Sequence, residues 1–215
     1  QRVALARALV LEPEALLLDE PFSALDNHLR SEMEKELLEV LSAYNGVTLL
    51  VTHNLKESYR ICQNLMILEG GRKEAYGRKE LIFQQPPTKT AAQLTGCKNL
   101  SEARAHPDNT VQALDWGCVL KVNQMIPDSL THVGIRGHHL EFVNQPATEN
   151  VLPCRVVSAV DSPYQVTLNL APESAPGTCL LQAEMSKEQW NQLKNGPFPL
   201  LVYFNPEHIF LTETA

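Results

Sequence analysis

The chain has 215 residues, of which 44% are hydrophobic and 20% are charged, as in an ordinary globular protein. This composition excludes a disordered, collagen-like or coiled-coil chain, and no apolar run reaches the roughly 20 residues that a membrane-spanning helix needs. The formal charge of −7 argues against broad binding to nucleic acid, because that binding needs a cationic surface. We therefore expect no nucleic acid among the partners.

The first part of the chain, residues 1–96, has the pattern of helices that alternate with strands. Apolar residues at steps of three and four predict an amphipathic helix over 27–44, closed by Asn45-Gly46. Short apolar runs predict buried strands on either side of it. The remaining expected elements are helices at 2–11 and 55–62 and strands at 15–18, 47–52, 65–68 and 72–76. Strands that alternate with helices indicate an α/β fold with a mostly parallel sheet.

The second part, residues 97–215, has the pattern of short strands between turns. One helix is expected there, over 187–194, and seven strands are expected at 111–114, 118–122, 133–136, 154–160, 165–170, 179–184 and 200–204. Strands of this length and spacing are typical of a small β-barrel or sandwich. We expect two domains, 1–96 and 97–215, joined near 85–99, where Pro86-Pro87 ends a helix.

Polar side chains follow two of the expected strands in the first part. Asp19 and Glu20 end one strand, and His53 follows the next. In α/β sheets ligands bind at the carboxyl ends of parallel strands. There, one acid can hold Mg²⁺ while its neighbour orients and deprotonates an attacking water, and an imidazole can contact a phosphate. A polar turn explains the two acids as well, and a lone histidine after a strand is more often structural.

Four sequence blocks in 1–96 stand in an order and spacing that resemble the second half of an ABC transporter ATPase cassette. These blocks are Gln1 to Leu9, the strand that ends in Asp19-Glu20-Pro21, Ser23 to Asp26, and Val51 to His53. The resemblance implies a partial P-loop NTPase sheet with helices, which binds ATP and Mg²⁺.

The same resemblance implies a role for individual residues. Gln1 would be the last residue of the signature loop, which contacts ATP across a dimer. Asp19 would be the Mg²⁺-associated acid of the Walker B strand, and Glu20 would be the general base. Asp26 would be the D-loop acid at the dimer interface, and His53 would be the switch histidine that senses the γ-phosphate.

The chain lacks several of this family's motifs, among them the Q-loop and all but the last residue of the signature loop. No G-x-x-x-x-G-K-[ST] motif occurs in it, so the backbone amides and the lysine that cradle ATP phosphates are absent. We therefore expect the chain to be the carboxyl-terminal fragment of a longer subunit, truncated before the signature-loop glutamine. We expect this fragment to be inactive by itself.

The second part resembles the TOBE domain of importer ATPases, a small all-β, OB-like barrel. The residues that carry this resemblance are Glu80 to Phe83, Pro86 to Thr88, Gly96, Asn99, Gly134 to Arg136 and Pro206 to Ile209. The stretches 95–100 and 156–168 look most like those of molybdate or sulfate importers, some of which sense the oxyanion with this domain. Possible oxyanion donors are Lys121, Ser158, Gln165 and Thr167, although polar residues on the outer face of a barrel explain them better. Similarly, His132, His138 and His139 fit a solvated loop better than a metal site.

Together these observations predict the ATP-hydrolysing subunit of an ABC importer that energises oxyanion uptake, with molybdate first and sulfate or tungstate as related substrates. The expected partners are a second ATPase subunit, transmembrane permease subunits and, indirectly, a solute-binding protein, with an oxyanion at the TOBE domain. The expected location is the cytoplasmic face of the cell membrane. Uptake of iron, sugar or polyamine is an alternative, as is a non-enzymatic oxyanion-binding regulatory module.

Overall fold

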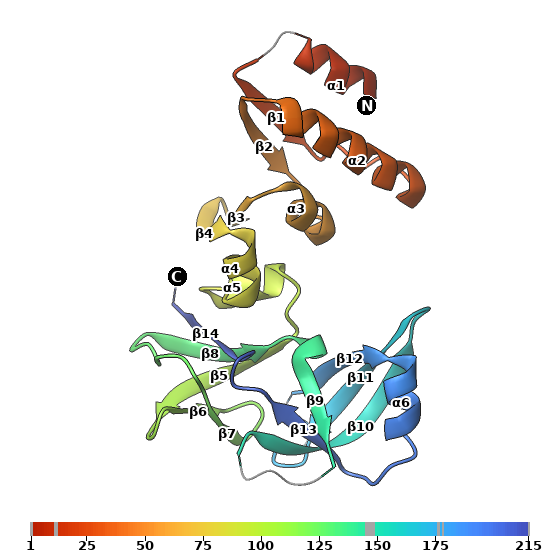
Figure 1. The fold of residues 1–215 in the computed structure, drawn as a ribbon. Coiled ribbons are helices and arrows are strands. Elements are labelled where there is room, and N and C mark those ends of the chain that lie inside the picture. The colour runs from red at the N-terminus through yellow and green to blue at the C-terminus, as the bar shows by residue number, and fades with distance from the viewer. Residues whose placement is uncertain (1, 11–12, 145–148, 176, 178, 215) are drawn as a thin grey trace. The chain divides into compact units, whose positions relative to one another are not determined.

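The computed structural model describes residues 2–10, 13–144, 149–175, 177 and 179–214, and it divides into two compact units, Gln1–Leu65 and Met66–Ala215 (Figure 1). No helix in the described part of the chain is long and apolar enough to cross a membrane. The predicted domains, 1–96 and 97–215, are segments expected to fold independently. That division stays a prediction.

The first unit is an α/β arrangement built on two parallel strands. Its elements are α1 (Arg2–Leu9), β1 (Ala15–Asp19), α2 (Asn27–Ala43), β2 (Val47–Val51) and α3 (Leu55–Ile61). The strands pair in register from Ala15 opposite Val47 to Asp19 opposite Val51. The chain segments that follow β1 and β2 therefore leave the sheet at the same edge. The predicted parallel pairing is confirmed, and the predicted element ends differ by one or two residues.

The core of the first unit forms under α2. Met33 and Leu37 are buried on one face of this helix, and they pack with Phe22 from the turn after β1. The exposed residues of α2 are mostly polar or charged, so the helix covers the core with one face.

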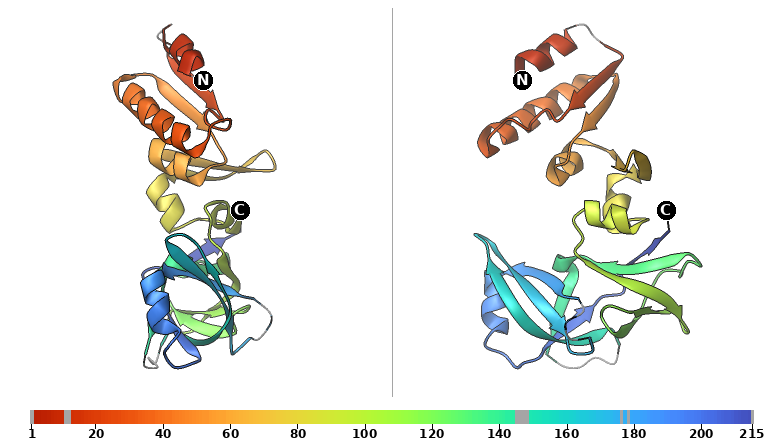
Figure 2. Two further views of the ribbon diagram at one scale, coloured as in Figure 1. Left: turned by 90° about the vertical axis from the view of Figure 1, so that its right-hand side faces the viewer. Right: turned by 180° about the vertical axis from the view of Figure 1, so that it is seen from behind.

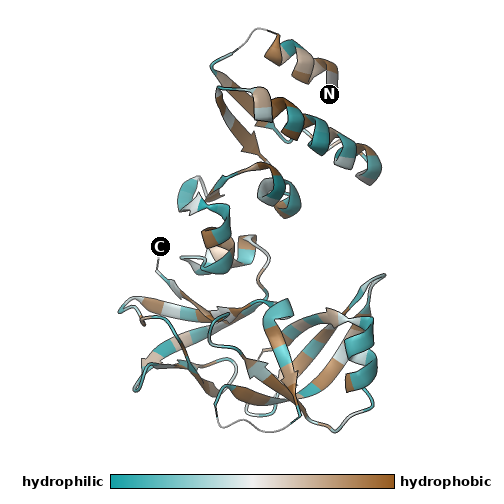
Figure 3. Ribbon diagram, viewed as in Figure 1, coloured by the Kyte–Doolittle hydropathy of each residue, from teal (hydrophilic) through white to brown (hydrophobic). Residues whose placement is uncertain are grey.

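Part of the two-stranded sheet is apolar and exposed. Leu17 and Val47 are each 72% exposed, and Leu49 and Val51 are 55% and 51% exposed. Figure 3 shows β1 and β2 as largely hydrophobic strands. Strands of parallel sheets are normally covered on both faces, and here several large apolar side chains remain in contact with solvent.

The second unit starts with a hairpin and two helices. Strand β3 (Asn64–Glu69) crosses the boundary between the units and pairs with β4 (Arg72–Arg78), and then come α4 (Lys79–Gln84) and α5 (Lys89–Leu94). Arg136 donates hydrogen bonds to the carbonyl oxygens of Phe83 and Thr95 and stacks on the Phe83 ring. This one side chain thereby ties the ends of both helices to the strands that follow.

The rest of the second unit is all-β and contains two five-stranded antiparallel sheets, seen from further sides in Figure 2. One sheet has the order β14 (Phe210–Glu213), β8 (Leu130–Ile135), β5 (Asn99–His106), β6 (Thr110–Ala113), β7 (Cys118–Lys121). The other has the order β12 (Leu181–Ser186), β11 (Gln165–Pro172), β10 (Val151–Asp161), β13 (Leu200–Phe204), β9 (Leu140–Val143). The two sheets share one hydrophobic core, in which Trp116 packs on Phe204. The predicted order, α/β followed by all-β, is confirmed, as is the helix at 187–194, which is α6 (Lys187–Leu193).

Some details of the second unit differ from the sequence-based prediction. Strands β5, β9 and β14 were not predicted, and β5 turns small and polar residues inward. The predicted strand 154–160 contains a bulge between Val156 and Ser158 that shifts the register of β10, and Val160 is 54% exposed. The predicted strand 179–184 starts earlier than β12, and Leu180, which precedes β12, is 42% exposed.

The side chain of Asn99, on β5 of one sheet, pairs with the backbone of β12, an edge strand of the other sheet. Asn99 is fully buried, its Nδ2 donates to the carbonyl oxygen of Gln182 over 2.9 Å, and its Oδ1 accepts from the Gln182 amide over 2.7 Å. An edge strand has unpaired backbone groups, and here one amide side chain pairs with them as a neighbouring strand would. Asn99 therefore holds the amino-terminal end of β12.

We predict that Asn99→Ala lowers the free energy of unfolding of the chain by about 2 to 4 kcal/mol, because it leaves a backbone donor and an acceptor of Gln182 unpaired. Urea denaturation measures the change. Asn169→Ala is the matched control, since Asn169 makes one exposed side-chain hydrogen bond, to Ser158, and we expect a loss below about 1 kcal/mol there. Equal losses in the two variants would contradict the proposed role of Asn99.

Candidate active site

Glu20 and His53 meet at the carboxyl ends of β1 and β2. The Nδ1 atom of His53 lies 2.7 Å from Oε1 of Glu20, and the backbone amide of His53 donates to the same oxygen over 3.1 Å. The other carboxylate oxygen, Oε2, has no hydrogen-bonding partner among the described residues. The side chain of Glu20 is one-third exposed and that of His53 is 83% exposed, so a solvent-facing carboxylate is held in place by a neighbouring imidazole.

The backbone of Glu20 adopts an uncommon conformation that fixes its direction. Its φ angle is +45°, in the left-handed region that costs a non-glycine residue about 1 to 2 kcal/mol. The Glu20 amide donates to the Val51 carbonyl oxygen, and the Glu20 carbonyl oxygen accepts from the amide and hydroxyl of Ser23. Buried Phe22 anchors the same turn in the core. Such a conformation persists only where the surroundings hold it, and it is common at functional sites.

The other predicted site residues have different surroundings. Asp19 is the last residue of β1, is exposed, and has no partner for its carboxylate within the described ranges. Asp26 caps the amino terminus of α2, where its carboxylate accepts from the amides of His28 and Leu29. Gln1 lies outside the described residues. The structure therefore brings Glu20 and His53 together, leaves Asp19 at the adjacent strand end, and gives Asp26 a capping contact.

A buried carboxylate that the sequence analysis missed supports the turn around His53. Glu57 is 3% exposed, and it accepts from the hydroxyl of Thr52 over 2.7 Å and from the amide group of Asn54 over 3.0 Å. Arg30 lies 3.7 Å from the same carboxylate. Thr52 and Asn54 flank His53, so the turn that presents the imidazole is tied to α3 on both sides. A sequence signal existed, since Asn54 three residues before an acid is typical of a helix start.

The carboxylates here do not form a metal cage by themselves. No group of three or more His, Cys, Asp or Glu side chains in the described part of the chain is placed to hold a metal ion. Mg²⁺ in nucleotide sites is usually held by one or two carboxylates together with phosphates and water, so a free carboxylate such as that of Asp19 fits this kind of binding.

The candidate oxyanion donors of the second unit are partly engaged with protein groups. The Nζ of Lys121 pairs with Glu149 over 3.1 Å, and the hydroxyl of Ser158 accepts from Asn169 over 2.9 Å. Gln165 and Thr167 lie on β11, the strand next to that of Ser158, whereas Lys121 lies on a strand of the other sheet. Lys121 and Ser158 therefore already bind protein groups on the strand surfaces. The binding of an oxyanion by the four candidate donors stays a prediction.

The histidines considered as an alternative metal site lie in two different elements, His132 on strand β8 and the other two in a short helix. His138 and His139 are in the short 3-10 helix η1 (Gly137–His139), and the ring of His139 stacks on His208 with 4.0 Å between centroids. Burial, followed by the nearby His138 and His208, lowers the pKa of His139 to about 4. His139 is therefore neutral at pH 7 and packs as a ring.

Comparison with known proteins gives a consistent set of relatives. The chain is 30% identical over 194 residues to the sulfate/thiosulfate import ATP-binding protein CysA of Bacillus cereus. The matched region covers 90% of this chain and 53% of that protein. It is 33% identical over 195 residues to CysA 2 of Chromobacterium violaceum, with 89% and 52% covered. It is also 30% identical over 163 residues to the spermidine/putrescine import ATP-binding protein PotA of Mycoplasmopsis synoviae, with 74% and 36% covered.

The chain is homologous to ABC importer ATP-binding subunits.

This homology with importer ATP-binding subunits runs through both units, and the chain spans about half the length of the curated relatives it matches. No protein-family model matches the chain. A solved structure of the cytoplasmic molybdate-binding protein ModG, with molybdate bound, has a TM-score of 0.40 and 11% identity over 55% of this chain and 92% of that chain. A likeness at that TM-score carries no argument about function.

We predict that Glu57→Ala loosens the turn that carries His53, because Thr52 and Asn54 lose their shared acceptor. Amide hydrogen exchange at Asn54 should become at least about tenfold faster, which corresponds to about 1.4 kcal/mol of local stability. Glu39→Ala, which removes an exposed carboxylate of α2, is the control and should leave this exchange rate unchanged. Unchanged exchange in Glu57→Ala would show that the turn does not depend on Glu57.

Proposed function

We propose that the chain is the carboxyl-terminal part of the ATP-hydrolysing subunit of an ABC importer. The observation that carries the proposal is the Glu20–His53 contact, formed at the ends of two parallel strands in a chain homologous to import ATP-binding proteins. A base that acts on water needs a carboxylate oxygen open to solvent, and Oε2 of Glu20 is such an atom.

The residues at the carboxyl ends of β1 and β2 have different roles in this proposal. Asp19 binds Mg²⁺ directly or through water, and the ion neutralises phosphate charge when it is bound. Glu20 accepts a proton from the attacking water, and His53 holds the Glu20 carboxylate and faces the terminal phosphate. Gln1 and Asp26 contribute to ATP binding and to the interface with a second subunit.

The exposed apolar face of β1 and β2 supports the view that these strands belong to a larger sheet. Leu17, Val47, Leu49 and Val51 are each more than half exposed in the first unit, whereas strands of parallel sheets are usually covered on both faces. The proposal places the P-loop and the missing strands in sequence upstream of Gln1. A G-x-x-x-x-G-K-[ST] motif within about 150 residues upstream would meet this expectation.

We further propose that the transported substrate is an oxyanion of the sulfate and molybdate type. The support is that two of the relatives above are sulfate/thiosulfate import proteins. The subunit then works as a dimer on the cytoplasmic face of the membrane with permease subunits and has an oxyanion-responsive second domain. A solute-binding protein is an indirect partner. Polyamine uptake is the second candidate, because PotA matches at similar identity.

We predict that Glu20→Gln in the full-length subunit lowers the rate of ATP hydrolysis by about two to four orders of magnitude while ATP still binds, because the amide keeps the shape of the side chain but cannot accept the proton. Phosphate release and equilibrium binding of ATP measure the two effects. His53→Ala should lower the rate as well, and Glu39→Gln on the exposed face of α2 is the control.

The 215-residue chain by itself should show no MgATP turnover above background, because it contains no phosphate-binding loop. Normal turnover in full-length Glu20→Gln would refute the assignment of the base. An absence of hydrolysis in the full-length protein itself, with sulfate or molybdate still bound by the second unit, would favour the non-enzymatic regulatory module.

A further inference from the structure

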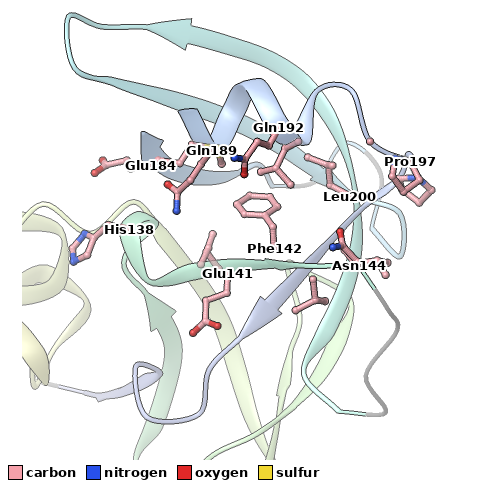
Figure 4. A pocket seen from close by; sticks show the side chains of 16 residues that line it. His138, Glu141, Phe142, Asn144, Glu184, Gln189, Gln192, Pro197 and Leu200 are labelled. Carbon is pink, nitrogen blue, oxygen red and sulfur yellow. The ribbon is translucent and has the colours of Figure 1, made fainter. Parts of the chain in front are cut away.

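The second sheet of the second unit encloses a cavity between its own two edges. Strands β9 and β12 are the first and last in the sheet order, and residues of both line one cavity of about 790 Å³ (Figure 4). The sheet therefore curls until its edges face each other without pairing along their whole length. Cavities that hold small organic ligands usually measure about 300 to 1,000 Å³.

The cavity is closed at one end and covered by a helix. Asn99 bridges to the backbone of Gln182 at the start of β12, and a Cβ atom on Gly137 would lie only 2.7 Å from the Gln182 carbonyl oxygen. Helix α6 starts from Ser186, which forms a capping box with Gln189, and it lies over the remaining gap. The walls are thus fixed by hydrogen bonds at both the closed end and the helix start.

The floor of the cavity is apolar. Leu140, Met185 and Leu200 line it and are 4% to 7% exposed, and half-buried Phe142 and Leu193 complete the surface. Figure 4 shows the ring of Phe142 between α6 and β9. An aromatic face in this position offers contact to an apolar group and also to a cation.

The rim of the cavity is polar and acidic. Its lining includes the carboxylates of Glu141 and Glu184 and the amides of Asn144, Gln189 and Gln192, and no lysine or arginine occurs among the described residues that line it. Glu184 has no ion-pair or hydrogen-bonding partner among the described residues, whereas Glu141 accepts from Asn205 over 3.2 Å. Figure 4 places Glu184 beside Gln189 at one end of the cavity, with His138 across from them.

Two basic side chains of the surrounding elements are engaged elsewhere. Lys187, at the start of α6, pairs with Asp161 over 2.9 Å, and the guanidinium of Arg136 is bound to Phe83 and Thr95. Glu184 forms no ion pair among the described residues, so its carboxylate favours a cation over an anion at this end of the cavity.

We propose that this cavity, the seam cavity, binds an amphipathic organic cation. The ammonium group pairs with Glu184 and hydrogen-bonds to the amide of Gln189, and the apolar part of the ligand lies on Phe142, Met185 and Leu200. The ligand class follows from an apolar floor, an unpaired carboxylate and a lining in which no lysine or arginine occurs among the described residues. The seam cavity would bind such a cation whether or not the subunit hydrolyses ATP. Its charge preference is opposite to that of an oxyanion site.

Three probes of similar shape and different charge test the proposal on the 215-residue chain. Phenethylamine is a cation, 2-phenylethanol is neutral, and phenylacetate is an anion, and isothermal calorimetry gives the dissociation constant of each. We expect phenethylamine to bind at least about threefold to tenfold more tightly than 2-phenylethanol, as one charge-assisted contact provides, and phenylacetate to bind weakest.

Two carboxylate variants locate the binding. Glu184→Gln should lower the affinity for phenethylamine by about threefold to tenfold and leave that for 2-phenylethanol unchanged. Glu188 is an exposed acid of the neighbouring helix α6 that does not line the cavity, and Glu188→Gln should change neither affinity. The probe series on the unmodified chain decides the charge preference even if a variant fails to fold. Tighter binding of phenylacetate, equal affinities, or no binding of any probe at millimolar concentration would overturn the proposal.

Discussion

The in-register parallel pairing of β1 with β2 is the constraint on which the candidate active site depends. It places Asp19 opposite Val51, so the turn after each strand starts at the same edge and the Glu20 carboxylate reaches the His53 amide and imidazole. A slip of one residue would turn the alternating side chains of one strand to the opposite face and separate the two groups. The left-handed backbone of Glu20 and the buried contacts of Phe22 and Glu57 keep both turns in place.

The second unit depends on polar side chains that take the place of backbone pairing. Asn99 pairs with the edge of β12, and Arg136 binds the carbonyl ends of α4 and α5. The Arg136 contacts tie the segment that carries α4 and α5 to the β-rich part of the second unit. A buried polar group that loses its hydrogen-bonding partner lowers the stability of the fold by more than the hydrogen bond itself contributes. Substitution of Asn99 or Arg136 should therefore destabilise the second unit.

Much of the fold could be predicted from the sequence, because apolar periodicity decides which segments of the first unit become strands and helices. The strand ends that carry Asp19, Glu20 and His53 were likewise predictable from their position after apolar runs. Strand β5 was not, since its inward residues are small and polar, and one of its two neighbours, β8, lies 30 to 36 residues away along the chain. The role of Glu57 also required the structure, because burial and the hydrogen bonds to Thr52 and Asn54 are not visible in a pattern.

The central claim is that Glu20 and His53 act as one unit, and a double-mutant cycle on ATP turnover tests it most directly. Turnover is measured for the full-length subunit, for Glu20→Gln, for His53→Ala and for the double variant. If His53 acts through the Glu20 carboxylate, the double variant hydrolyses ATP no more slowly than Glu20→Gln, because removing the second member of a unit has no further effect. Losses that multiply in the double variant would show independent roles and contradict this account.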